Sequence, residues 1–183
     1  MTVSGGAQFI SYQEVITKVQ LIEGMNVAAL GCGNLGYFII PMAKVIGKEG
    51  KAYAVDILKD VLDAVRSRAK FEGITNLETV WSNLEKFGST KIPQESLDAD
   101  FLINVLFQNK NHEEILKEAA RLLKKGGKLI VIDWKKIGIP FGPPVEIRVE
   151  SAQIKGLASK LNLQLLEETE FGDYFWGLIL QKI

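Results

Sequence analysis

The 183-residue chain is 47% hydrophobic, so it can bury roughly two thirds of its unfolded surface around a single core. Lysine plus arginine and aspartate plus glutamate number 22 each, which removes the broad positive field that a nucleic-acid backbone usually requires of its partner. One cysteine, Cys32, and one histidine exclude an internal disulfide and a four-ligand zinc site, so no metal is expected. We therefore expect one domain over residues 1–183 and no nucleic-acid partner.

Residues 1–23 are predicted to form a helical lead-in to this domain. Val15 and Val19 share one face of a helix over residues 12–21, and Gly24 ends it. The chain does not begin with a basic stretch followed by an apolar run, and no apolar run approaches the ~20 residues that span a bilayer. The expected location is the cytoplasm, without membrane contact.

The next part of the chain alternates between buried strands and helices. A brief apolar run that ends in glycines is typical of a strand buried on both faces, and a segment that is apolar all round is typical of a helix packed against a sheet. The predicted elements are strands at 26–30, 51–56 and 77–81 and helices at 35–46 and 58–71.

The alternation continues with a strand at 99–105, a helix at 112–123 and, after a break at Gly126-Gly127, a strand at 128–133. Repeated strand–helix units predict a doubly wound, mostly parallel sheet between two helical layers. The last predicted elements are a helix at 151–161 and strands at 163–168 and 175–181. The turn between those two strands is too short for a crossover, so we expect a seven-stranded α/β sandwich that ends in an antiparallel hairpin.

The strongest local motif is Gly31-Cys32-Gly33-Asn34-Leu35-Gly36, between a predicted strand and a predicted helix. Glycines there let the backbone turn tightly and let a ligand approach the helix N-terminus. Asp56 ends the next strand about twenty residues later, where a carboxylate can accept both hydroxyls of an adenosine ribose. An ordinary tight turn at the glycines and a helix N-cap at Asp56 are the alternatives.

Several segments carry a family resemblance beyond this motif. They are residues 27–38, 54–56, 81–85, 100–107 and the run Glu-Ala-Ala-Arg-Leu-Leu-Lys-Lys-Gly-Gly-Lys-Leu at 118–129. From Gly24 to Lys182 the sequence resembles the class I S-adenosylmethionine-dependent methyltransferases, especially the small single-domain kind. The 118–129 run is similar to that family's helix and Gly-Gly turn before strand five, which dehydrogenases lack.

The resemblance implies S-adenosylmethionine as cofactor, S-adenosylhomocysteine as product, and a small or medium-sized acceptor that the sequence does not identify. In that arrangement the glycine turn holds the methionine part of the cofactor, Asp56 holds the ribose, and Asn104 lies beside the methyl group. By the same resemblance, Asn83 and Leu84 after the third strand contact the adenine, and a further cofactor contact, Ile57, follows the second strand. The full cofactor set is Gly31, Cys32, Gly33, Gly36, Asp56, Ile57, Asn83, Leu84 and Asn104.

Two positions depart from the family pattern. Ala29 stands where many members carry an acidic residue, and Asn83 stands where aspartate is usual. Loss of the first carboxylate removes a charge-assisted contact worth ~1.5 to 3 kcal/mol. An impaired S-adenosylmethionine-binding module is therefore an alternative function. A nicotinamide-dependent oxidoreductase shares the glycines and Asp56 but needs a further substrate domain.

The acceptor site is expected at the carboxyl edge of the sheet, bordered by a Pro- and Gly-rich loop at 138–144. Methyl transfer is an in-line displacement that needs alignment and exclusion of water but no obligatory acid or base, so no catalytic residue is assigned. His112 is predicted to be an exposed residue of a first helical turn, and Trp176 a core residue. The candidate acceptor contacts are Phe107, Asp133, Trp134 and Phe141.

Overall fold

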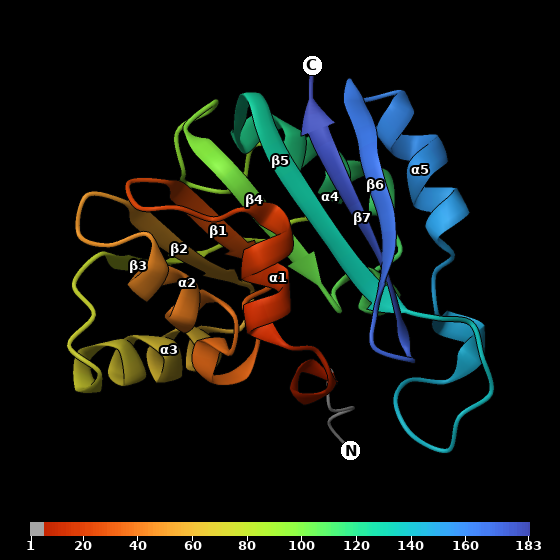
Figure 1. The fold of residues 1–183 in the computed structure, drawn as a ribbon, viewed down its shortest axis with the longest axis horizontal. Coiled ribbons are helices and arrows are strands. Elements are labelled where there is room, and N and C mark those ends of the chain that lie inside the picture. The colour runs from red at the N-terminus through yellow and green to blue at the C-terminus, as the bar shows by residue number, and fades with distance from the viewer. Residues whose placement is uncertain (1–5) are drawn as a thin grey trace.

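The computed structural model describes residues 6–183 and contains one seven-stranded sheet with helices on both faces (Figure 1). The strands are β1 (Asn26–Leu30), β2 (Lys51–Asp56), β3 (Leu77–Trp81), β4 (Leu97–Ile103), β5 (Leu123–Trp134), β6 (Leu163–Phe171) and β7 (Phe175–Lys182). The α-helices are α1 (Tyr12–Val19), α2 (Ile39–Val45), α3 (Lys59–Phe71), α4 (His112–Leu122) and α5 (Ser151–Ser159). Short 3-10 turns occupy Ala7–Phe9, Asn34–Gly36, Leu106–Gln108 and Val145–Ile147.

The strand order, β3-β2-β1-β4-β5-β7-β6, confirms the predicted fold class. β1 to β5 are parallel to one another, whereas β7 is antiparallel to both β5 and β6. In Figure 1 the arrowhead of β4 lies at the lower edge of the sheet and that of β7 at the upper edge. The carboxyl ends of β1 to β5 therefore share the lower edge, where the predicted site residues follow their strands.

Two apolar clusters hold the three layers together, one on each face of the sheet. Alternation along β1 sends Val27 and Ala29 into the cluster beneath α1, α2 and α3, and Ala28 and Leu30 into the cluster beneath α4 and α5. These four side chains are at most 5% exposed. A strand buried on both faces is what a doubly wound sheet requires. Within residues 6–183 no helix has the length and apolar character needed to cross a bilayer.

The helix predicted at 35–46 begins later, because α2 starts at Ile39. Leu35 and Gly36 both have φ of +59°, so the backbone is still in a left-handed turn at the point where a helix was expected. The turn that connects β1 to α2 is therefore longer than the apolar pattern suggested.

The strand boundaries around the fourth and fifth strands were also wrong. β4 ends at Ile103 rather than at residue 105, because Asn104 adopts φ +58° and leaves the extended conformation. The Gly126-Gly127 pair does not break the chain before β5 but lies within it. Leu123 already pairs with Leu97, and Lys128 pairs with Ala99, so the four residues between them form an irregularity in the ladder.

Candidate cofactor site

The glycine turn after β1 combines close packing at one glycine with open space at another. A side chain at Gly31 would meet Val105 Cγ2 at 2.6 Å, so only glycine fits there. Gly33 has φ +66° and ψ 178°, a conformation almost restricted to glycine, and a Cβ there would meet nothing within 4 Å. Bare, exposed backbone beside open space is a surface that a ligand can approach closely.

Asp56 lies next to this turn. Its Oδ2 atom accepts a hydrogen bond from the Gly33 amide at 3.2 Å, and its Oδ1 atom accepts one from the Leu58 amide at 3.0 Å. Cys32 Sγ lies 3.9 Å from the same Oδ2 atom, and burial, followed by the charge of Asp56, raises the pKa of this thiol. Cys32 is therefore a neutral packing residue, and the half-buried carboxylate of Asp56 is the charged group of the turn.

The ends of β2 and β3 are joined at the same edge. The Ser82 amide donates to the Asp56 carbonyl at 3.1 Å, and the Trp81 Nε1 group donates to the Ile57 carbonyl at 2.8 Å. Ile57 and Trp81 are 52% and 50% exposed, so both offer apolar surface. Asn83, whose Oδ1 atom accepts from the Glu85 amide at 3.0 Å, begins the next turn. Trp81 was absent from the predicted site because its proximity to Ile57 depends on strand register.

Asn104 has an unusual environment at the end of β4. The residue is 5% exposed, and its backbone is in the left-handed conformation. Neither its Oδ1 nor its Nδ2 atom has a hydrogen-bond partner within residues 6–183. A buried amide without partners costs about 1–3 kcal/mol, which a ligand with both a donor and an acceptor would recover. Its neighbour Val105 packs against Gly31, so this amide lies beside the glycine turn.

The structure therefore brings the predicted cofactor residues to one edge. Contacts run without interruption from Ser82 through Asp56 and Gly33 to Gly31 and Val105. A nucleoside with an amino-acid tail fits this donor set, because it offers ribose hydroxyls to a carboxylate and polar groups to bare backbone. Ala29 is buried and pairs with Ala54 and Phe101, so nothing in the strand replaces the family's acidic residue there.

Asp133 faces the protein's own backbone rather than open space. Its fully buried carboxylate accepts hydrogen bonds from the amides of Leu106 at 3.0 Å, Phe107 at 3.2 Å and Trp134 at 2.8 Å. Burial raises the pKa of Asp133 to about 7, although these three amide donors oppose the shift. The residue thus anchors the turn after Asn104, and its contact with an acceptor stays a prediction.

The aromatic residues predicted near the acceptor occupy different depths. Trp134 is fully buried, and Phe141 lies over it with ring centroids 6.3 Å apart. The ring centroid of Phe141 also lies 5.2 Å from that of Phe9 and 4.9 Å from that of Tyr174. Phe9 is 46% exposed, so these three rings form an accessible aromatic cluster at the carboxyl edge.

The remaining predicted aromatics are buried. Phe107 is 6% exposed and packs in the same cluster as Trp134. Trp176 packs on the opposite face of the sheet, where its Nε1 group donates to the Val149 carbonyl at 2.9 Å, so it is a core residue as predicted. Sequence reasoning missed Phe9 and Tyr174, because only the folded chain brings them to Phe141.

Arg148 is a further residue that the sequence did not indicate. It is 3% exposed, and its guanidinium donates to the carbonyls of Lys135, Ile137, Phe141 and Pro143 at 2.7–3.3 Å. The group also lies 5.3 Å from the Trp134 ring centroid. One side chain therefore shapes the 138–144 loop that carries Phe141.

His112 is half-buried rather than exposed. Its Nε2 atom lies 3.0 Å from the Leu106 carbonyl and 2.8 Å from the Asn109 carbonyl, and its Nδ1 atom lies 3.2 Å from Gln153 Nε2. Two carbonyl acceptors require a proton on Nε2, so Nδ1 accepts from Gln153. All polar atoms of the ring are used to join the turn after β4 to α5.

Comparison with known proteins identifies the class to which this geometry belongs. The profile of a family described as "Methyltransferase domain" matches residues 21–170, so the chain belongs to that family. This match confirms the methyltransferase family that the sequence predicted. The nicotinamide alternative is not supported.

Particular relatives extend this result. The ubiquinone/menaquinone biosynthesis C-methyltransferase UbiE of Laribacter hongkongensis is 30% identical over 147 residues, covering 79% of this chain and 57% of that protein. The demethylmenaquinone methyltransferase of Listeria welshimeri is 28% identical over 128 residues, covering 70% and 52%. The chain thus spans little more than half the length of these relatives.

Solved structures confirm the fold. A SAM-dependent methyltransferase from Aquifex aeolicus superposes with a TM-score of 0.86 at 23% identity, covering 98% of this chain and 93% of that one. The [4+2]-cyclase SpnF superposes with a TM-score of 0.79 at 13% identity, covering 93% and 80%. Because a cyclase shares the architecture, the fold alone does not determine the reaction.

Proposed function

We propose that this protein transfers the methyl group of S-adenosylmethionine to a small apolar acceptor that contains a planar ring. The observation that carries the cofactor half of the proposal is the open backbone at Gly33, between Asp56 and the side-chain amide of Asn104, which has no partner in the described part of the chain. The cofactor supplies an electrophilic methyl group, and the residues of the chain align the reactants and exclude water.

The accessible aromatic cluster supports the choice of acceptor. Phe9, Phe141 and Tyr174 lie at the edge where the cofactor residues gather, and aromatic faces favour a flat apolar ring. The names of the two curated relatives refer to ubiquinone and menaquinone, which are ring compounds of this kind. Quinol-type rings are therefore the first acceptors to test. We also propose that residues 1–183 act as one domain located in the cytoplasm.

Calorimetric titration with S-adenosylhomocysteine tests the cofactor site. Asp56→Ala is expected to weaken binding by ~1.5 to 3 kcal/mol, because charge-assisted hydrogen bonds to both ribose hydroxyls are lost. Asp60→Ala is the matched control, since Asp60 is an exposed carboxylate four residues away in the first turn of α3. Equal affinities for the two variants would remove Asp56 from the site.

Turnover separates an enzyme from a protein that only binds the cofactor. Labelled methyl from S-adenosylmethionine should appear in a demethylated quinol and not in an aliphatic acceptor of similar size. Tight S-adenosylhomocysteine binding without transfer to any ring acceptor would instead indicate the noncatalytic module that Ala29 makes conceivable.

A further inference from the structure

The connection from β3 to β4 is unusual for a doubly wound sheet because residues 82–96 form neither helix nor strand. Polar backbone groups in such a segment must find partners outside regular secondary structure. Asn83 and Leu84, the proposed adenine contacts, lie at its beginning. Residues 82–90, named here the adenine loop, therefore need an external support to hold a fixed position.

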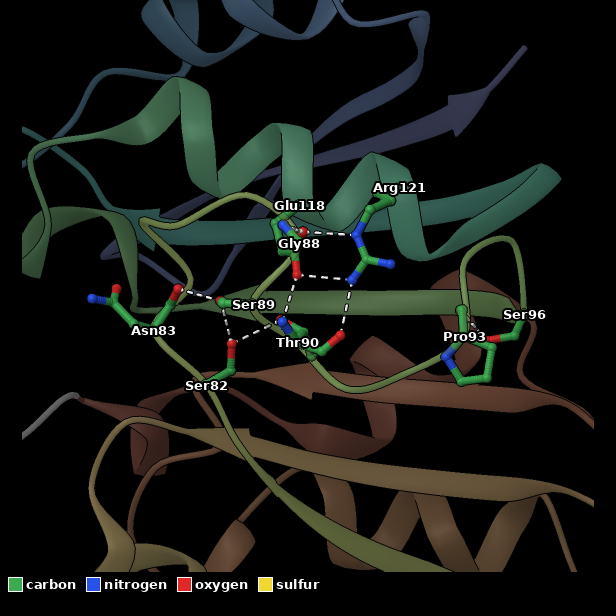
Figure 2. Close-up of polar contacts among 9 residues, drawn as sticks. All are labelled: Ser82, Asn83, Gly88, Ser89, Thr90, Pro93, Ser96, Glu118 and Arg121. Atoms are coloured by element: carbon green, nitrogen blue, oxygen red, sulfur yellow. Dashed lines mark hydrogen bonds and ion pairs between the residues drawn. The ribbon is translucent and has the colours of Figure 1, made fainter.

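The support comes from Glu118, a fully buried residue of α4. Its carboxylate accepts hydrogen bonds from the amides of Gly88 at 2.7 Å and Thr90 at 2.8 Å (Figure 2). The two donors stand on either side of Ser89, at 30 and 28 residues from Glu118 in the sequence. The far end of the adenine loop is thus attached directly to the helix.

Arg121 completes this attachment one turn later on α4. Its Nε and Nη2 atoms donate to the Glu118 carboxylate at 2.9 Å, and Nη2 also donates to the Thr90 carbonyl at 2.9 Å (Figure 2). Burial would raise the pKa of Glu118, but Arg121 and the two amide donors outweigh it and lower that pKa to about 2. The carboxylate is therefore charged at every pH at which the protein would work.

A chain of hydroxyl groups continues from Thr90 to Asn83. Ser82 Oγ lies 2.9 Å from both Thr90 Oγ1 and Ser89 Oγ, and Ser89 Oγ donates to the Asn83 carbonyl at 2.6 Å (Figure 2). Ser82 and Thr90 are 1% and 3% exposed, so water does not replace these bonds. A displacement of Thr90 would consequently move the backbone of Asn83.

The adenine loop in turn holds the beginning of α4. The Glu85 carboxylate accepts from the amides of Lys110 at 3.2 Å and Asn111 at 3.1 Å. Glu118 of the helix thus binds amides of the loop, and Glu85 of the loop binds amides at the start of the helix. The two segments are joined at both ends of α4 and behave as one unit.

From this arrangement we propose that Glu118 and Arg121 are positioning residues for the cofactor site, a role that rests on the proposed function. They touch neither cofactor nor acceptor. They hold the adenine loop on α4, so that Asn83 and Leu84 meet the adenine ring in a fixed geometry and S-adenosylmethionine binds without first ordering the loop.

Two conservative variants and one control test this role. Glu118→Gln removes the charge, and Arg121→Lys keeps the charge but loses the fork that reaches both Glu118 and Thr90. Each variant is expected to bind S-adenosylhomocysteine on the order of tenfold more weakly. Each loses a charged hydrogen bond that holds the loop, and if part of that free energy is lost from cofactor binding, the affinity falls by about a factor of ten. Lys117→Met is the control, because Lys117 pairs with Glu113 and Glu114 on the same helix without touching the loop.

Hydrogen exchange and a double-variant cycle distinguish positioning from general stabilisation. At a temperature where circular dichroism shows both variants folded, exchange at Gly88 and Thr90 should accelerate while exchange in β4 stays unchanged. The affinity loss from Arg121→Lys should also shrink in a background of Asn83→Ala with Leu84→Ala, because the loop then has no adenine contacts left to position.

The possible failures are distinguishable. If the unaltered protein does not bind S-adenosylhomocysteine, the proposed function itself fails. The positioning role is overturned if the unaltered protein binds S-adenosylhomocysteine and both variants bind it with the same affinity as the unaltered protein. It is also overturned if Arg121→Lys lowers the affinity by the same factor with and without the Asn83 and Leu84 side chains.

Discussion

At the scale of single residues, the cofactor site depends on backbone conformations that side chains oppose. Gly33 is extended with a positive φ, and Asn104 is left-handed with both amide atoms buried and partnerless within residues 6–183. Strain and unsatisfied polarity of this kind persist only where surrounding structure imposes them. Both residues lie just after neighbouring strands, β1 and β4, which supports the proposed binding of one ligand at both positions.

Gly33→Ala is expected to lower both the folding free energy, through backbone strain, and the affinity for the cofactor, and the two effects can be measured separately. A methyl group there would stand in the space that the cofactor enters, so affinity for S-adenosylhomocysteine should fall at least about tenfold, or 1.4 kcal/mol. The variant should also lose about 1–3 kcal/mol of folding free energy from the imposed conformation. Calorimetry and urea denaturation measure the two quantities.

Gly73→Ala provides the matched control for this glycine. Gly73 follows α3 with φ +68°, and a Cβ there also meets nothing within 4 Å. The control should lose about 1–2 kcal/mol of stability from the left-handed backbone and keep its full affinity. If both variants lose affinity equally, the effect comes from the fold and not from the turn.

At the scale of elements, loops of the carboxyl edge are shaped by side chains from other elements. Asp133 at the end of β5 fixes the turn after β4, Glu118 on α4 fixes the adenine loop, and Arg148 fixes the 138–144 loop. Each of these side chains binds backbone groups of the segment that it fixes. Irregular segments thereby gain the rigidity that a binding site needs from the helices and strands around them.

Arg148→Lys is expected to loosen the acceptor side without affecting the cofactor side. A lysine cannot reach four carbonyls, so some of those buried acceptors lose their partners and the free energy of unfolding should fall by about 1–3 kcal/mol. Exchange of amides in residues 135–144 should accelerate, whereas affinity for S-adenosylhomocysteine should not change.

The exposed Arg66 supplies the comparison for this substitution. Arg66 bonds to Asp63 and Thr79 on the surface of α3, so Arg66→Lys should change stability by less than about 1 kcal/mol. A large loss of cofactor affinity in Arg148→Lys would show that the 138–144 loop belongs to the cofactor site instead.

At the scale of the whole molecule, the order of the strands and helices followed from periodicity because the central strands β1, β2 and β4 are buried along most of their length. The glycine motif and Asp56 were predictable for the same reason, since they occupy strand ends that the pattern locates. The roles of Glu118, Arg148 and Phe9 were not, because their partners lie in irregular segments or far away in sequence. Periodicity carries no information about such contacts.

One buried carboxyl group works against the stability of the whole fold. Asp100 lies in the middle of β4, between Ala28 and Leu129, and it is fully buried. Neither carboxyl oxygen has a hydrogen-bond partner within residues 6–183, and burial raises the pKa well above its usual value. Asp98, two residues earlier on the strand, is satisfied by the Asn26 amide at 2.7 Å and by Lys124 at 2.8 Å.

The sign of the resulting pH dependence follows from linkage. Below the unfolded-state pKa of about 4, Asp100 is protonated in both states and carries no charge penalty. As the pH rises from there toward the raised folded-state pKa, the unfolded state releases the proton first, so the free energy of unfolding falls. Asp133, whose pKa is about 7, adds a contribution of the same sign between about pH 4 and 7.

Asp100→Asn should therefore be more stable than the unaltered protein at pH 8, by about 1–3 kcal/mol, because the variant cannot place a charge in the core. Near pH 4 the two proteins should be nearly equal, and the slope between pH 4 and 8 should be shallower in the variant, which keeps only the Asp133 contribution. Asp98→Asn should instead lower stability at pH 8, since it weakens a satisfied pair. Urea denaturation at pH 4, 6 and 8 measures all three proteins, and a variant at Asp100 that loses stability at pH 8 would mean that its carboxylate is charged and paired in solution.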